Sequence, residues 1–280
     1  MSKRKKLGTV VAVNLVIIFA CLVAIYPVFI MVSGAFKTSQ ELAHNAAGLP
    51  IKATIENFSR LINYNSGLIV RTFGNSILVA SLYTALCCAL ASMAAYAFAK
   101  FRFPGRNAIF LFLLVTMMIP AELNITPLYL IFSKIGWLNT YRVQIIPGAA
   151  NVFALFLLRQ SMMSIPDSLI EAARIDGAGE FKIFRKIVLP VSVPSIGALA
   201  ILQFLSKWNE LLYPKIMLTK EKLMPIMVIL PTLNETDSAR SVPWELVLAG
   251  CTLVTIPLII VFLLFQDKFL SSVTLGAVKG

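Results

Sequence analysis

The sequence predicts an all-α membrane protein with six transmembrane helices. Of its 280 residues, 58% are hydrophobic and only 14% are charged, whereas a soluble globular domain carries about 25% charged residues. The apolar residues also gather in six runs, most of them near the roughly 20 residues that a helix needs to cross a bilayer. At this length the chain has room for one membrane domain.

The six apolar runs divide the chain into segments. The helices are expected at residues 9–33, 72–99, 107–132, 143–158, 191–213 and 246–265. The second run is rich in small residues such as Ala80 and Ala85, which allow close helix packing in lipid. The fourth run is short and contains Pro147. The resulting segments are an N-terminus at 1–8, the first helix at 9–33, an outer segment at 34–71, a core at 72–265 and a tail at 266–280.

The N-terminus has some features of a secretory signal, because cations at residues 3–6 precede an apolar run. The uncharged stretch from Leu7 to Phe36 has 30 residues, whereas the apolar region of a signal peptide has about 7–15. We therefore expect an uncleaved first transmembrane helix.

The placement of Lys and Arg predicts the orientation of the chain. With the N-terminus inside, the cytoplasmic segments hold 14 cations, the outer segments hold ten over more residues, and Lys207 lies within a helix. The segment 100–106 is the strongest indication, because it is short and carries three cations. An even number of helices places the C-terminus in the cytoplasm as well. The polar segment 164–190 then falls inside, and the long segment 214–243 falls outside.

The composition also argues against several functions. The formal charge of +12 comes from cations at the ends of apolar runs, which indicates membrane topology rather than nucleic-acid binding. The four cysteines lie inside apolar runs without metal-ligand spacing, and His44 is the only histidine, so no metal, cofactor or disulfide is expected. The sequence has no phosphate-binding G-x-x-x-x-G-K-[ST] loop and no Ser/His/Asp set. The chain is therefore not expected to be an enzyme, and ATP hydrolysis would require partners.

The segment 164–190 is a polar interruption between two apolar runs. Pro166 suits a first helical turn, and acidic residues follow it at the positive end of the helix dipole. Gly177 can adopt a positive φ and ends this helix. Such an elbow, tied to a transmembrane helix, can transmit force. The alternative is an amphipathic loop that lies on lipid headgroups.

A second short helix is expected from Phe181 to Val188. It carries an apolar stripe of Phe181, Phe184, Ile187 and Val188 opposite basic residues. Pro190 then starts the fifth transmembrane helix.

The residues of this segment resemble a known signature. The run Glu171-Ala172-Ala173, followed by Asp176-Gly177-Ala178 and by Leu189-Pro190, is similar to the EAA loop of the membrane subunits of ATP-binding-cassette (ABC) importers. The resemblance covers roughly residues 70–265 and implies the type I (MetI-like) importer permease fold. It also implies a surface for an ATPase subunit, formed by Glu171, Ala172, Ala173, Asp176, Gly177, Ala178, Phe181 and Phe184.

Three further features resemble the smaller maltose-type permease subunit of the carbohydrate branch. They are Trp208-Asn209-Glu210 near the outer end of the fifth helix, the turn Pro104-Gly105-Arg106 and the C-terminal run 276–280. The resemblance implies ATP-driven import of a sugar or oligosaccharide across a bacterial or archaeal cytoplasmic membrane. The implied partners are a second homologous permease, an ATPase dimer and an extracytoplasmic sugar-binding protein, which the segment 214–243 would contact.

Polar residues within or near the apolar runs are candidates for the translocation path or its gate. These residues are Glu122, Asn124, Asn151 and Asn209. Intramembrane acids usually face the bundle interior or a water cavity; the alternative for Glu122 is a carboxylate that reaches the outer interface. Asn75, Asn151 and Gln203 can instead join helices through hydrogen bonds, and Lys207 and Glu210 suit a local i,i+3 ion pair.

Two other functions remain open from the residues alone. The first is import of another solute, such as an amino acid, peptide or phosphate, by the same architecture. The second is an ion-coupled secondary transporter, although internal repeats and a deep midplane acid, which are common in that class, are not visible in the sequence.

Overall fold

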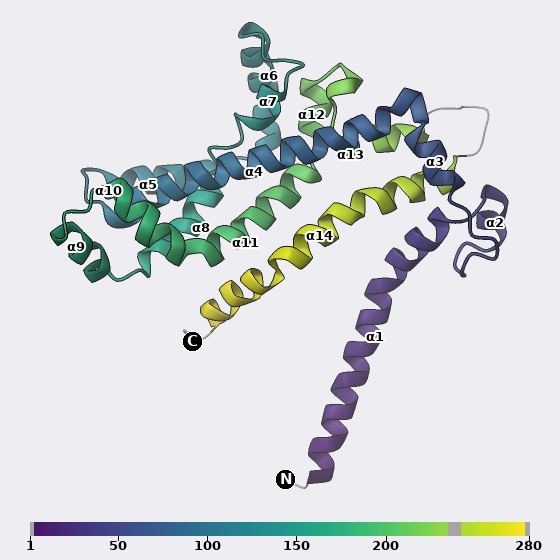
Figure 1. The fold of residues 1–280 in the computed structure, drawn as a ribbon, viewed down its shortest axis with the longest axis horizontal. Helices are drawn as coiled ribbons and strands as arrows, with labels where there is room; N and C mark the ends of the chain where they lie inside the picture. The colour runs from purple at the N-terminus through teal and green to yellow at the C-terminus, as the bar shows by residue number, and fades with distance from the viewer. Residues whose placement is uncertain (1–2, 235–241, 278–280) are drawn as a thin grey trace. The chain divides into compact units, whose positions relative to one another are not determined.

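The structure is a computed structural model, and it describes residues 3–234 and 242–277, with side chains described at 10–233, 242–264 and 266. The chain forms two compact units (Figure 1). The first unit comprises Met1–Ile69 and Leu230–Ile256, and the second comprises Val70–Ile229 and Pro257–Gly280. Throughout the described residues the regular secondary structure is helical, as the sequence predicts.

The helices follow one another along the chain with short connections. The first unit contains α1 (Lys3–Ala35), α2 (Ser39–His44), α3 (Glu56–Ile62), η1 (Tyr64–Gly67), η5 (Leu230–Asn234) and the first half of α14 (Trp244–Ala277). The second unit contains most of α4 (Leu68–Lys100), then α5 (Arg106–Thr116), η2 (Ala121–Asn124), α6 (Ile125–Lys134), α7 (Tyr141–Ile145), α8 (Val152–Met163), α9 (Asp167–Ile175), α10 (Glu180–Ile183), the π-helix η3 (Phe184–Val188), α11 (Leu189–Trp208), α12 (Leu212–Met217), η4 (Glu221–Leu223) and α13 (Ile226–Ile229).

Four helical stretches of the described chain are long and apolar enough to cross a membrane by themselves. They are Val10–Ala35, Tyr64–Lys100, Glu180–Trp208 and Trp244–Leu264. Each overlaps one of the predicted runs, namely the first, second, fifth and sixth, and the fifth ends at Trp208 although its run was predicted to extend to residue 213. The fifth is longer than expected because α10, η3 and α11 form one continuous helical stretch.

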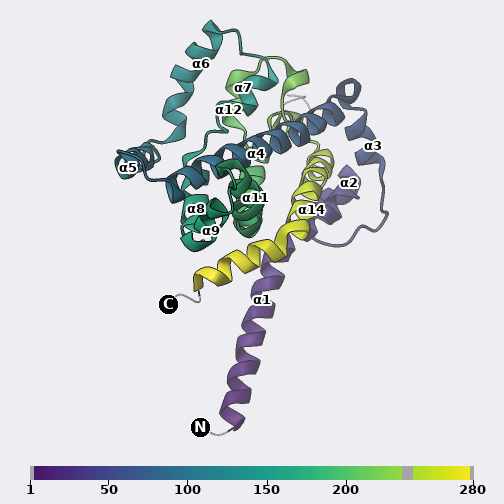
Figure 2. The same ribbon diagram turned by 60° about the vertical axis from the view of Figure 1, so that its left-hand side comes forward.

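The other two predicted helices are broken. The run 107–132 forms α5 and η2–α6, which meet at 90° (Figure 2). Pro120 lies in the break and cannot donate a backbone hydrogen bond. The run 143–158 forms α7 and α8, separated at Pro147-Gly148. Predicting these runs as continuous helices was therefore wrong in detail, because hydrophobicity persists through both breaks.

The core of the second unit joins α4, α8, α9, α10, η3 and α11. Within it, α8 and α11 lie side by side (Figure 1). The fully buried side chains at its centre come from all of these elements. They include Cys87, Ala95, Leu158, Met162, Ile170, Ile183, Val188 and Leu199. Small residues on α4 allow the close approach that the sequence predicts.

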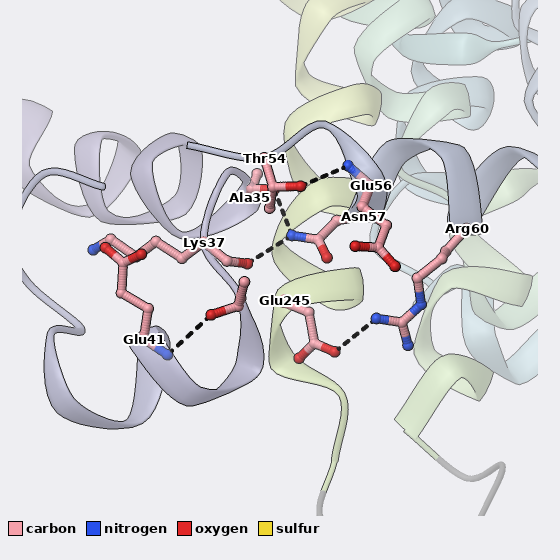
Figure 3. A network of polar contacts seen from close by, with 9 residues as sticks. Ala35, Lys37, Glu41, Thr54, Glu56, Asn57, Arg60 and Glu245 are labelled. Carbon is pink, nitrogen blue, oxygen red and sulfur yellow. Dashed lines mark hydrogen bonds and ion pairs between the residues drawn. The ribbon is translucent and has the colours of Figure 1, made fainter. Parts of the chain in front are cut away.

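The first unit is built around a buried lysine (Figure 3). The Lys37 side chain is fully buried, and its Nζ donates hydrogen bonds to the carbonyls of Asn45 and Gly48 at 2.7 and 2.6 Å. The buried Asn57 donates to the carbonyls of Ala35 and Lys37. These contacts hold the segment that follows α1 in place, because the buried Lys37 ammonium and Asn57 amide both donate to its backbone carbonyls.

An ion pair joins α3 to the beginning of α14 in the same unit. Arg60 Nη1 lies 3.3 Å from Glu245 Oε1, and the Glu245 side chain is buried (Figure 3). Gly34 faces Leu248, which a Cβ at position 34 would strike. The ends of α1 and α14 therefore pack closely within this unit.

Two expectations fall on residues outside the described part of the chain. These are the end of the C-terminal run at 278–280 and residues 235–241 of the segment 214–243.

Candidate functional site

The polar segment 164–190 folds into the elbow that the sequence predicts. Pro166 stands at the N-cap of α9, and the helix begins at Asp167. At the C-terminus of α9, Gly177 has φ +76°, a conformation that glycine adopts without steric cost. The Ala178 N–H donates to Ala173 O at 3.0 Å and the Gly177 N–H to Arg174 O at 3.0 Å, which is the hydrogen-bond pattern of a Schellman cap. The turn is therefore defined by its backbone hydrogen bonds.

The elbow is fastened to the end of α4 by two polar contacts. Lys100 Nζ lies 2.7 Å from Asp167 Oδ1 and also donates to Ile165 O at 2.5 Å. The Tyr96 hydroxyl donates to Glu180 Oε2 at 2.7 Å. The loop thus has one fixed contact at the start of α9 and a second at the start of α10.

A third contact bridges the two arms of the elbow. Arg174 Nε lies 2.7 Å from Glu180 Oε1. Because Glu180 accepts from both Arg174 and Tyr96, one carboxylate links α9, α10 and α4. Both side chains of the ion pair are about 40% exposed (42% and 41%), so its role is to fix geometry more than to stabilise the fold.

The elbow continues into α11 through the π-helix η3. Ile183, Phe184 and Val188 are buried in the core of the second unit. Phe181, by contrast, is 69% exposed. Phe184, Ile187 and Val188 of the predicted stripe face the core, whereas Phe181 lies at the surface, so the stripe needs correction at Phe181 alone. Phe184 is a core residue and is not accessible for docking.

The outer surface of the elbow is formed by most of the residues singled out in the sequence. Glu171, Ala172, Asp176, Gly177 and Phe181 are exposed, and Ala173 and Ala178 are half-buried where they pack against the core. Sequence reasoning missed Ile175, whose side chain is 86% exposed. The sequence feature that could have identified Ile175 is that it is a single apolar residue between Arg174 and Asp176. Ile175 and Phe181 give this polar surface two exposed apolar contacts.

The charged groups of the elbow affect one another's titration. The hydrogen bond and charge of Lys100 lower the pKa of the Asp167 carboxyl below its ordinary value. The hydrogen bond to Glu180 raises the pKa of the Arg174 guanidinium. Lys100, Asp167, Arg174 and Glu180 also line a polar cleft of about 480 Å³ beside α9.

A second site lies where the two broken helices of the second unit meet. A cavity of about 420 Å³ is lined by the α5–η2 break from Thr116 to Asn124 and by the α7–α8 break from Pro147 to Asn151. Non-helical backbone at membrane depth is tolerated where it is buried in protein or lines a water-filled cavity. Both breaks are therefore explained by the cavity that they enclose.

The structure brings some of the predicted path residues to this cavity and not others. Asn124 and Asn151 line it, whereas the lining residues do not include Glu122 or Asn209. Asn151 also caps α8, because its Oδ1 accepts from the Ala154 N–H at 2.9 Å. The Asn209 amide donates to Leu205 O in its own helix, and Glu122 is exposed on η2.

The hydrogen-bonding roles expected for two other amides are confirmed. Asn75 donates to the carbonyls of Lys222 and Met224, and Gln203 accepts a 3.4 Å hydrogen bond from the Tyr83 hydroxyl. These bonds join α4 to the segment before α13 and to α11.

The Lys207–Glu210 ion pair expected from their spacing is confirmed and also lines the cavity. Lys207 Nζ lies 2.6 Å from Glu210 Oε2. Trp208 beside the pair is buried and stacks on Phe204. Tyr83 reaches the cavity from α4 and donates to Gly148 O at 3.0 Å. Sequence reasoning missed Tyr83, because only the folded chain places α4 beside the α7–α8 break.

These features define a class of protein. The membrane subunit of a transporter would have these features: several apolar helices, a cavity between broken helices and an elbow attached to a transmembrane helix. The described residues contain no group of three or more metal-ligating side chains that could hold a metal ion. The chain belongs to the family of binding-protein-dependent transport system inner membrane components, whose model matches residues 53–274.

Relatives with assigned functions support this membership along nearly the whole chain. The arabinooligosaccharides transport system permease of Halalkalibacterium halodurans is 35% identical over 94% of this chain and 94% of its own length. The trehalose/maltose transport system permease of Thermococcus litoralis is 33% identical over 82% of each chain.

A solved structure matches the fold closely. It is a chain of a bacterial ABC transporter that imports the acidic polysaccharide alginate, with a TM-score of 0.84, 25% identity, and coverage of 96% of this chain and 99% of that chain. The expected class, a permease subunit of a binding-protein-dependent transport system, is confirmed. The protein is a multi-pass membrane protein of this family.

Proposed function

We propose that this chain forms one half of the membrane channel of an oligosaccharide importer and that the elbow at 164–190 is where an ATPase subunit moves it. The cargo class is supported by the named relatives, which carry arabinooligosaccharides and trehalose or maltose. The cavity between the broken helices is this chain's part of the path.

The observation that carries this proposal is the continuity between the elbow and α11. The helical stretch from Glu180 to Trp208 begins in the elbow and ends beside the cavity, where Lys207 is a lining residue. A displacement of α9 is passed to α10 through the Arg174–Glu180 pair and to α4 through Tyr96 and Lys100. Helices connected in this way move as one rigid body, and packed helices switch between discrete arrangements by such movements.

The proposed partners follow from what the chain lacks and exposes. In its sequence we find no phosphate-binding loop, so a dimer of ATPase subunits would supply hydrolysis. The cavity is open to one side of the chain, and a second homologous permease would close it. An extracytoplasmic sugar-binding protein would deliver the cargo to the segments 34–71 and 214–243.

The proposed orientation places both termini and the elbow in the cytoplasm. It rests on the distribution of Lys and Arg, above all on the short cationic segment 100–106. The elbow then lies on the side of the membrane that holds ATP.

Uptake by reconstituted vesicles tests the proposed function. The complex of both permeases, ATPase subunits and binding protein is expected to accumulate a labelled arabinotriose or maltotriose only when ATP is supplied. The control omits the ATPase subunits. Uptake that persists without them and follows an ion gradient would support the secondary-transporter alternative, and uptake restricted to an amino acid, peptide or phosphate would support the same architecture with another cargo.

A further inference from the structure

The cavity in the second unit contains a buried ion pair between two aromatic rings. Lys207 Nζ lies 2.6 Å from Glu210 Oε2, 4.9 Å from the centre of the Tyr83 ring and 5.4 Å from the centre of the Tyr213 ring. All four residues line the cavity. They come from three parts of the chain: α4, the C-terminal end of α11 and α12.

The ammonium and the carboxylate differ in exposure. The Lys207 side chain is 7% exposed, whereas that of Glu210 is 33% exposed. The ammonium is thus enclosed by the carboxylate and the two rings, while the carboxylate still faces the cavity. A buried ion pair contributes little to stability, because the cost of removing two charges from water offsets their attraction. Stability alone therefore gives no strong reason for this pair to be placed here.

The tyrosine hydroxyls are held away from the pair. The Tyr83 hydroxyl donates to Gly148 O, and the Tyr213 hydroxyl donates to Val143 O, both at 3.0 Å. Each ring is therefore fixed in place by the α7–α8 region. Gly148 makes this possible, since a Cβ there would lie 3.0 Å from the Tyr83 ring.

The cavity thus offers fixed aromatic surfaces, a charged donor and acceptor with no net charge, and the amides of Asn124 and Asn151. A neutral saccharide has matching chemistry: its C–H groups pack on aromatic rings, and its neighbouring hydroxyls can donate to a carboxylate and accept from an amide or ammonium. The volume of the cavity, about 420 Å³, lies within the roughly 300–1,000 Å³ of typical ligand pockets.

We propose that this cavity is a subsite for a neutral saccharide within this permease chain, with Glu210 accepting hydrogen bonds from sugar hydroxyls and the partly exposed Tyr213 contacting the apolar face of a sugar ring, while the buried Tyr83 supports the ion pair. The subsite rests on the proposed import of an oligosaccharide. It assigns part of the sugar recognition in the membrane to this chain itself.

Thiol protection in the assembled complex tests the subsite. Ala150 is an exposed lining residue, so the Ala150→Cys variant reports on occupancy of the cavity, in a chain whose exposed Cys21 is replaced by Ser. The matched control is Ser133→Cys, which is exposed on α6 and is not a lining residue. Maltotriose or arabinotriose, whichever the complex transports, is expected to slow labelling at position 150 several-fold and to leave position 133 unchanged.

The Glu210→Gln variant tests the assigned hydrogen bond. It keeps the shape of the side chain but removes its charge, and we expect the sugar concentration needed for half-protection to rise about tenfold, the loss of one charge-assisted hydrogen bond. The KM for transport should rise with it. Equal labelling of Ala150→Cys with and without a sugar that the complex transports would overturn the subsite and leave the proposed function standing. A complex that transports no saccharide would instead contradict the proposed function, and the subsite with it.

Discussion

At the residue scale, Gly177 controls the shape of the elbow. Its φ of +76° lies in the left-handed region, and the Schellman hydrogen bonds from Gly177 and Ala178 depend on it. An L-residue in this conformation costs roughly 1–2 kcal/mol. The shape of the elbow therefore depends on the backbone of one residue as much as on any side chain.

We expect Gly177→Ala to weaken the coupling between ATP hydrolysis and uptake. The matched control is Gly179→Ala, because a Cβ meets no atom within 4 Å at either position and only Gly177 has a positive φ. The expected result is a several-fold lower ratio of sugar transported to ATP hydrolysed for Gly177→Ala and a normal ratio for Gly179→Ala. Identical ratios in the two variants would show that the left-handed turn is not required.

A second residue-scale prediction concerns pH. The pKa of Asp167 is lowered in the folded chain by the hydrogen bond from Lys100. Because the folded pKa lies below the unfolded value of about 3.9, this contribution is complete above that value and is lost as pH falls through the folded pKa. Asp167→Asn should lower the melting temperature of the detergent-solubilised complex at pH 7, and the difference from the native chain should shrink below about pH 4. A difference that stays constant down to pH 3 would exclude this ion pair as its source.

The buried Lys37 gives a third prediction at this scale. Replacing it with Met removes the donor to the Asn45 carbonyl and one of the two donors to the Gly48 carbonyl, which keeps the Ser33 hydroxyl. An unpartnered buried acceptor costs about 1–3 kcal/mol. Lys37→Met is therefore expected to make the segment 38–62 sensitive to protease, whereas the exposed Lys52→Met should not. Equal protease resistance in both variants would mean that the lysine is not needed to hold this segment.

At the scale of elements, the elbow and α11 form one helical stretch, and Glu180 at its start connects it to α9 and α4. Tyr96→Phe removes the hydroxyl that donates to Glu180 and keeps the ring contacts with Phe101 and Phe184. We expect a several-fold fall in ATP-driven uptake with little change in the amount of folded protein. The control is Tyr129→Phe, an exposed position on α6. Normal uptake in Tyr96→Phe would show that force reaches α11 without this contact.

The elements differ in how far the sequence could predict them. Pro166 and Gly177 fix the ends of α9 through local backbone chemistry, so both ends were predicted. The breaks at Pro120 and Pro147 were missed, because the apolar runs continue across them and the cavity that makes them favourable is tertiary. Phe184 was predicted both on the apolar stripe and on the docking surface; its burial in the core with Val188 agrees with the stripe and rules out docking.

In the candidate sites, too, features set by the local sequence were predicted and features set by the tertiary structure were not. The ion pair of Lys207 and Glu210 was predicted from i,i+3 spacing, which is a local property. The ring of Tyr83 beside it could not be predicted, since it reaches the cavity from α4, which is distant in the sequence, whereas Tyr213 is only three residues from Glu210. Docking by the elbow came from a resemblance and remains a prediction.

At the scale of the whole molecule, the account requires the elbow and the segment 34–71 to lie on opposite sides of the membrane. Leu49 is 70% exposed in that segment, and Ile175 is 86% exposed on the elbow. In intact cells, a membrane-impermeant thiol reagent should label Leu49→Cys and should label Ile175→Cys only after the membrane is opened. The opposite pattern would reverse the proposed topology.

The central claim is that an ATPase subunit binds the elbow, and crosslinking tests this claim most directly. A cysteine at Ile175, in a chain with Cys21 replaced by Ser, is treated with a short bifunctional thiol reagent in a complex that transports sugar. We predict a covalent product of this chain with the ATPase subunit at position 175 and none for Leu49→Cys. A transport-active complex in which Ile175→Cys and Ala172→Cys both give no product with the ATPase would contradict the claim.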